Sequence, residues 1–216
     1  MDLLLSSEET PLVQKYMDIL TDGGVFMWLI IATSILLAAI VIYKFLTLNN
    51  TNVFPGKLRR LISDFAENPS EQKAEELQKT LESSDSTLGD LCKAALSKQE
   101  EGQDEVEKLV EIKARESIVK ISSGLSVIDV IITIAPLLGL LGTASGLVGV
   151  FSSLDGDVTD HTALAKGISE ALYTTIAGLA VAVPGVIAQS HFTRKVETMA
   201  SELELLMSKF IGVISK

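Results

Sequence analysis

Polar side chains that could pass protons stand inside long apolar runs of this chain. Thr143 lies in the uncharged stretch APLLGLLGTASGLVGVFSSL, and Thr174 and Thr175 lie in another uncharged run further along. Glu170 precedes this threonine pair by about one helical turn. Hydroxyl groups both donate and accept hydrogen bonds, and a carboxylate in an apolar layer is costly unless it faces a cavity, a partner or water. These residues would form a polar belt inside an otherwise apolar layer, with the carboxylate at its outer end.

Each of these residues also has a simpler interpretation. A threonine in a membrane helix often bonds the carbonyl four residues earlier and does nothing else. Glu170 could be an interfacial carboxylate solvated by headgroup water. Asp129, at the other boundary, is interpreted as an interfacial group.

Small residues accompany the polar ones at helical spacing. Glycine destabilises a helix relative to alanine, so four glycines in one uncharged span indicate that another helix comes very close. The glycines expected to pack helices are Gly139, Gly142, Gly146, Gly149, Gly167 and Gly178. Pro136 and Pro184 are expected hinges, because proline removes one backbone hydrogen bond.

Three uncharged runs are long enough to cross a bilayer, which requires about 20 residues. They are Gly23–Tyr43, Val130–Leu154 and Ala171–Thr193. The sequence therefore predicts an all-α polytopic membrane protein with three transmembrane helices. The expected segments are 1–22 (N-terminal), 23–47 (first span), 48–125 (helical loop), 126–154 (second span), 155–166 (short link), 167–190 (third span) and 191–216 (C-terminal helix).

Lysine and arginine placement predicts the orientation. Eleven of these residues lie in 48–125 and four follow His191, whereas segment 1–22 and the link 155–166 have one each. Positive charge marks the cytoplasmic side. We therefore expect the loop and the C-terminus in the cytoplasm, and the N-terminus and the link outside.

Apolar periodicity predicts long helices beyond the membrane. An amphipathic pattern from about Asp104 is expected to continue without a break into the second span. The tail carries a heptad stripe, read as bundle core or as packing between subunits. Its members are Phe192, Val196, Met199, Leu203, Leu206, Phe210 and Val213. Residues 56–100 are expected to form short helices punctuated by Pro55, Pro69 and Gly89.

Depth matching brings the polar groups together. If residues 142 and 178 mark the span midpoints, Thr143 and Thr175 lie within ~5 Å of the membrane centre on antiparallel helices. No acid of the chain lies deeper than Glu170. A proton path would then need a titrating group from another polypeptide.

Other functions fit poorly. The formal net charge of −10 argues against nucleic-acid binding. His161 and His191 are expected on opposite sides of the membrane, so no metal site is predicted. The single cysteine, Cys92, cannot form an internal disulfide. We expect no cofactor and no catalytic residues, since the sequence offers no nucleophile–base set.

At this point the chain resembles the MotA/TolQ/ExbB proton channel family, and most closely its three-span ExbB/TolQ branch. The resemblance rests on APLLGLLGTASGLVGVF in the second span and GISEALYTTIAGLAVAVPGVIAQSHF in the third. The family often has an acidic–basic pair at the end of the first span, where this chain has Tyr43 and Lys44.

The resemblance implies a homopentameric ring around single-span ExbD- or TolR-like subunits, whose intramembrane aspartate titrates. It implies that Thr143, Thr175 and Glu170 face the proton path, with Thr174 beside them, and that the small-residue face lets the partner helix sit against a smooth wall. It also implies a bacterial inner-membrane location, and proton flow that energises a TonB- or TolA-like protein for transport across the outer membrane. The alternatives are a TolQ-like envelope-maintenance motor, a non-conducting membrane scaffold, and a flagellar stator, whose branch has four spans.

Overall fold

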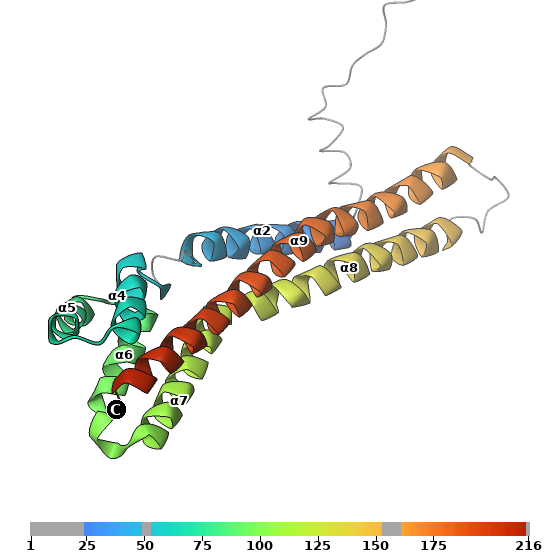
Figure 1. Ribbon diagram of the computed structural model, residues 1–216. Coiled ribbons are helices and arrows are strands. Elements are labelled where there is room, and N and C mark those ends of the chain that lie inside the picture. The colour runs from blue at the N-terminus through green and yellow to red at the C-terminus, as the bar shows by residue number, and fades with distance from the viewer. Residues whose placement is uncertain (1–23, 49–52, 153–160, 215–216) are drawn as a thin grey trace, which may run out of the picture. The chain divides into compact units, whose positions relative to one another are not determined.

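The structure is a computed structural model that describes residues 24–48, 53–152 and 161–214 (Figure 1). These residues form helices and turns and include no strand, which confirms the all-α prediction. They divide into two compact units. The apolar unit holds residues 24–40 and the described part of 127–188, and the polar unit holds the described parts of 41–126 and of the C-terminal residues from 189. The predicted segment 1–22 and the part of the predicted link before His161 lie outside the described residues.

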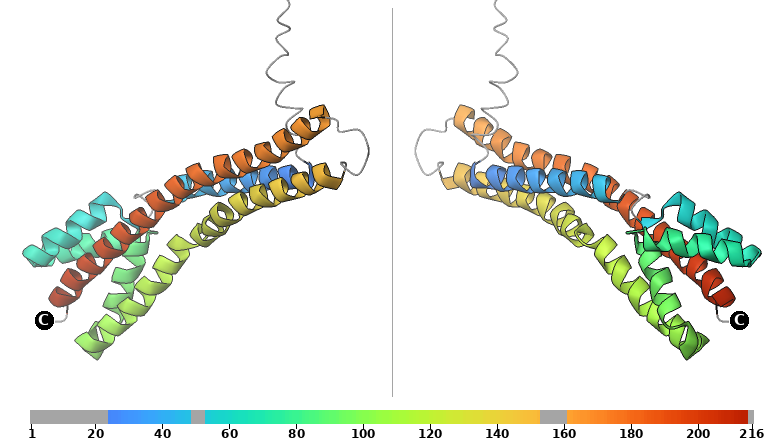
Figure 2. Two further views of the ribbon diagram at one scale, coloured as in Figure 1. Left: turned by 90° about the vertical axis from the view of Figure 1, so that its right-hand side faces the viewer. Right: turned by 90° about the vertical axis from the view of Figure 1, so that its left-hand side faces the viewer.

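The apolar unit is made of three helices that lie side by side: the parts of α2 (Gly24–Thr47), α8 (Leu125–Ser152) and α9 (His161–Ile214) that belong to it (Figures 1 and 2). Among the described residues, three helices are long and apolar enough to cross a membrane, as predicted. Large apolar side chains cover their outer surfaces; Trp28 is 63% exposed and Val148 64%. A surface of this kind suits contact with lipid or with other membrane helices.

One predicted helix end and the two expected hinges can be compared with the structure. α9 begins at His161, six residues before the expected start at Gly167. The sequence His161–Lys166 contains neither glycine nor proline and includes two alanines and a leucine, so it favours helix. α8 continues through Pro136 and α9 continues through Pro184, so both expected hinges lie inside unbroken helices.

The expected continuous helix from Asp104 into the second span is wrong. α7 (Gln103–Ser122) ends at a turn formed by Ser123 and Gly124, and α8 begins directly after it. Gly124 has φ +85°, a conformation that glycine adopts without steric cost. A glycine just beyond a helix is a common termination signal. The sequence contains this signal in Ser122-Ser123-Gly124.

The polar unit packs α4 (Gly56–Glu67), α5 (Glu71–Glu82), α6 (Thr87–Ser97) and α7 with the C-terminal part of α9. Each element contributes apolar side chains to a common core. Its buried members include Leu58, Ile62, Leu77, Leu81, Leu88, Leu91, Val106, Val110, Leu203, Met207 and Phe210. All members of the predicted tail stripe are buried except Val213, which is half-buried, so the interpretation as bundle core is confirmed.

Short polar signals set the ends of the small helices. Ser70 and Ser86 cap α5 and α6, accepting hydrogen bonds from the amides of Lys73 and Gly89. Gly89 therefore lies in the first turn of α6 and does not separate two helices, contrary to the prediction.

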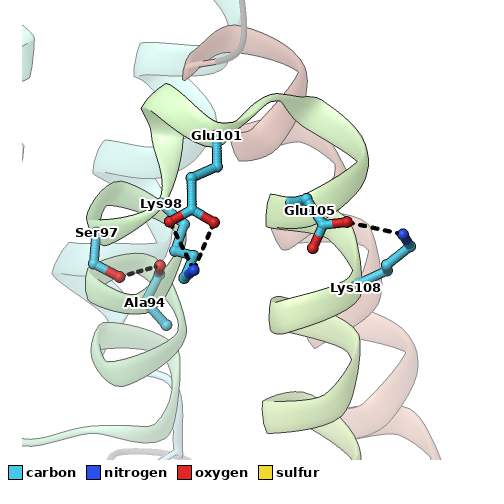
Figure 3. Close-up of polar contacts among 6 residues, drawn as sticks. All are labelled: Ala94, Ser97, Lys98, Glu101, Glu105 and Lys108. Carbon is cyan, nitrogen blue, oxygen red and sulfur yellow. Dashed lines mark hydrogen bonds and ion pairs between the residues drawn. The ribbon is translucent and has the colours of Figure 1, made fainter.

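The connection between α6 and α7 is a short 3-10 turn, Gln99–Glu101, followed by Gly102 with φ +101° (Figure 3). Lys98 Nζ lies 2.5 and 2.7 Å from the two carboxylate oxygens of Glu101, and Lys108 Nζ lies 3.0 Å from Glu105 Oε1. Both ion pairs are exposed and contribute little stability. The positive φ of Gly102 is what allows the chain to turn between the two helices.

Candidate functional site

α8 and α9 approach each other so closely that side chains are excluded between their backbones. A Cβ atom placed on Gly139 would lie 2.8 Å from the Thr174 carbonyl oxygen and 2.9 Å from Thr175 Cα. One placed on Gly178 would lie 2.5 Å from the Ala135 carbonyl oxygen. Ordinary contacts are 3.4–4 Å. Small residues at steps of three and four permit this approach between membrane helices.

The same contact extends along both helices. Added Cβ atoms on Gly142 and Gly146 would meet the Thr174 side chain and Ala171 Cβ, at 2.5 and 2.9 Å. A Cβ on Gly167 would meet Val150. Gly149 is different, since a Cβ atom placed on it would have no neighbour within 4 Å. Five of the six glycines expected to pack helices therefore lie in the contact between α8 and α9.

The close approach brings two threonine hydroxyls together. Thr143 Oγ1 on α8 and Thr175 Oγ1 on α9 lie 3.1 Å apart, within hydrogen-bonding distance. Both residues are half-buried. The two hydroxyls that were expected at one depth thus form a direct pair.

One main-chain oxygen lies at the centre of this group. The Gly139 carbonyl is 3.1 Å from Thr143 Oγ1, 3.2 Å from Thr174 Oγ1 and 3.1 Å from Thr175 Oγ1. A carbonyl oxygen has two lone pairs, so it cannot accept from all three hydroxyls and from the helix amide. Gly139, which was expected only to pack helices, therefore also supplies the common acceptor.

Two of the three hydroxyls have another carbonyl acceptor that lies closer than the Gly139 carbonyl. Thr143 can donate to the Leu140 carbonyl at 2.8 Å, and Thr174 to the Ala171 carbonyl at 2.7 Å. Thr175 then has one proton to give, either to the Gly139 carbonyl or to Thr143 Oγ1, since both acceptors lie 3.1 Å from its oxygen. This arrangement leaves lone pairs on the Thr143–Thr175 pair, which can accept a proton donor such as water or a carboxylic acid.

Glu170 lines a separate cavity of about 200 Å³ in the same unit. The first turn of α2 forms one wall, and Ser145, Ala171 and Thr174 contribute to the others. A cavity of this size with several polar groups can hold several waters. Glu170 thus faces a cavity, as expected of a carboxylate near a membrane.

Two expectations about this region require correction. For five of the six glycines the close contact lies between two helices of this chain, so those five are covered by the chain itself and not by a partner helix. Thr174 is buried, with 2% of its surface exposed, and its hydroxyl bonds carbonyls of α8 and α9. Its hydroxyl is therefore held inside the packed contact.

Sequence reasoning missed the role of Lys44. Its position after the first apolar run indicates an ordinary basic residue at the membrane boundary, but its side chain is only 2% exposed and its Nζ donates to the Ile121 carbonyl at 2.9 Å. The partner is a main-chain atom 77 residues away, which no local pattern indicates. Asp129, by contrast, is exposed. Across the described ranges, no three His, Cys, Asp or Glu side chains gather as metal ligands would.

Comparison with known proteins identifies the class to which this bundle belongs. Residues 83–205 match the model of the MotA/TolQ/ExbB proton channel family, a stretch that includes all three threonines and Glu170. The chain belongs to this family, which is a channel family and not an enzyme family.

The curated relatives indicate the ExbB branch. A protein of Methanothermobacter thermautotrophicus, named as an ExbB homolog of biopolymer transport, is 31% identical over 88% of this chain and 67% of its own length. An ExbB-type biopolymer transport protein of Vibrio cholerae is 47% identical over 30% of this chain and 29% of its own. The ExbB protein of Helicobacter pylori is 31% identical over 45% and 70%. The protein is thus a membrane protein of the ExbB type.

Proposed function

We propose that this chain is the ring-forming subunit of an inner-membrane proton channel that uses the proton motive force to energise transport across the outer membrane. The observation that carries the proposal is the Thr143–Thr175 pair, held at 3.1 Å within two membrane-length helices of a proton channel family. Hydroxyls that retain free lone pairs can accept a hydrogen bond from a protonated acid, and this bond breaks when the acid loses its proton.

The lack of an acidic residue at mid-membrane depth in this sequence indicates what the partner must supply. The sequence between residues 130 and 152 has no charged residue, and in the third span Glu170 lies toward the end where α9 begins. A mid-membrane titrating group must then come from a second polypeptide. We propose an ExbD- or TolR-like subunit with one membrane span and an intramembrane aspartate, enclosed by a homopentamer of this chain.

The other polar residues have subsidiary roles in this proposal. Glu170 and its cavity collect protons near the periplasmic entrance, and Thr174 fixes the spacing of α8 and α9. Pro136 and Pro184 are hinge positions, since each lacks the amide that would complete its helix turn. The N-terminus is periplasmic and the polar unit is cytoplasmic, in keeping with the lysine and arginine distribution.

Hydroxyl removal tests the assignment. We expect Thr143→Val and Thr175→Val to abolish proton-dependent transport while the complex with the partner still assembles, because valine keeps the shape and removes the hydroxyl. Thr143→Ser should retain activity. Thr133→Val is the matched control, since the Thr133 hydroxyl on the same helix bonds only the Asp129 carbonyl at 2.8 Å.

Proton flux into liposomes that hold the purified complex is the direct measurement, and the mass of the intact complex reports the stoichiometry. Normal flux in both valine variants would refute the site. A TolQ-like role is distinguished by which periplasm-spanning protein co-purifies, TonB-like or TolA-like. A complex that assembles but never conducts would support the alternative of a membrane scaffold.

A further inference from the structure

Lys44 is the only charged residue that is buried in the part of the chain the structure describes. It lies in the last turn of α2, and its ammonium donates to the Ile121 carbonyl on α7 at 2.9 Å. Both residues belong to the polar unit. The proposed proton path makes no use of this group.

The acceptor is a carbonyl that the fold deprives of its usual partner. Ile121 is the penultimate residue of α7, and the last four carbonyls of a helix have no intrahelical amide to bond. The chain leaves the helix at Ser123, whose amide bonds the Lys120 carbonyl at 3.3 Å, and then turns at Gly124. The Lys44 ammonium thus supplies a donor where the helix lacks one.

The charge suits this position. The carboxyl end of a helix carries partial negative charge, which favours a cation there. The ion pairs between described residues do not involve Lys44. Its ammonium is 6.0 Å from the centre of the Tyr43 ring, the outer limit of a cation–π contact. A lysine that only extended toward water would expose its head group, whereas this one is buried.

We propose that Lys44 is a charged cap that α2 supplies to the carboxyl end of α7, and that it is the positioning residue that keeps the Ser123–Gly124 turn closed. The turn is the backbone link from α7 to the helix that carries Thr143. A consequence for transport rests on the proposed function: in that channel, loss of the Lys44 cap would weaken coupled transport without altering the Thr143–Thr175 pair.

Hydrogen exchange on the full chain in lipid nanodiscs tests the cap. Lys44→Met removes the donor and keeps the aliphatic stem, and we expect the amides of residues 117–122 to exchange about tenfold faster, since a charge-assisted hydrogen bond is lost. The amides of α4 to α6 should be unchanged. Lys44→Arg should restore slow exchange, because arginine still donates.

The matched control is Lys120→Met, on an exposed lysine of the same helix end that pairs with Glu116 on the surface. It should leave exchange at 117–122 as in the wild type. Unchanged exchange in Lys44→Met, equal acceleration throughout the polar unit, or failure of Lys44→Arg to restore protection would each overturn the proposal. This measurement uses no transport assay, so it stands or fails separately from the proposed function.

Discussion

Substitution of Gly139 by alanine is the most direct test of how the two membrane helices hold the threonine pair. The new Cβ would lie 2.8 Å from the Thr174 carbonyl oxygen and 2.9 Å from Thr175 Cα. Both atoms belong to the backbone of α9, so no side-chain rotation relieves the overlap. To reach the shortest ordinary contact of 3.4 Å, the helices must separate by about 0.6 Å.

That separation acts on the hydroxyl pair. It would lengthen the Thr143–Thr175 distance from 3.1 Å to about 3.7 Å, beyond a hydrogen bond. Overpacking of this kind costs roughly 1–3 kcal/mol, and replacement of glycine in a helix returns roughly 1 kcal/mol. The net loss of about 0–2 kcal/mol leaves the protein folded. We expect Gly139→Ala to assemble with its partner and to lose most proton flux.

Gly149→Ala is the matched control, because it is the same substitution on the same helix with nothing within 4 Å. Its proton flux in liposomes should equal that of the wild type, and its melting temperature should be equal or slightly higher. Wild-type flux in Gly139→Ala would refute the link between helix spacing and conduction. A loss in Gly149→Ala as large as in Gly139→Ala would show that this face is occupied from outside the chain.

Two further predictions address packing and the polar unit. Gly146→Ala should lower the melting temperature because its Cβ would lie 2.9 Å from Ala171 Cβ, and Ala171→Gly in the same chain should restore it; purely additive losses would contradict this contact. Burial raises the pKa of the Cys92 thiol to about 12, so the folded chain keeps the proton while the unfolded chain, with a pKa near 9.0, releases it. The thiol therefore contributes stability that is complete below pH 9 and is lost as pH rises to 12, at about 1.4 kcal/mol per pH unit. Denaturant unfolding of wild type and Cys92→Ala across this range should differ by that slope, and parallel curves would contradict the buried thiol.

The sequence was sufficient for features that depend on composition and period. Three apolar runs predicted the three membrane-length helices, and the stripe from Phe192 to Phe210 predicted the face that α9 buries. The prediction of one uninterrupted helix was wrong because it relied on apolar periodicity and neglected a two-residue stop signal, Ser123 and Gly124. Periodicity averages over turns of helix, whereas a left-handed glycine acts at one residue.

The candidate site was predictable only in part. Equal depth of Thr143 and Thr175 follows from the rise per residue, but the sequence does not say which helix the glycines face. The contact between α8 and α9 emerges only when both backbones are in place. The Lys44 cap was unpredictable for the same reason, since its acceptor is a peptide carbonyl 77 residues away.

The Gly139 carbonyl has a consequence for how this protein is studied by genetics. Three threonine hydroxyls lie within hydrogen-bonding distance of a main-chain oxygen that every amino acid possesses, so no codon change deletes it. A mutational scan will report a separate effect on activity for each threonine. At Gly139 it will report only the effect of the added side-chain volume. Chemical synthesis reaches what mutagenesis does not: an ester in place of the Gly139–Leu140 amide would weaken that oxygen as an acceptor and add no atoms to the side chains around it.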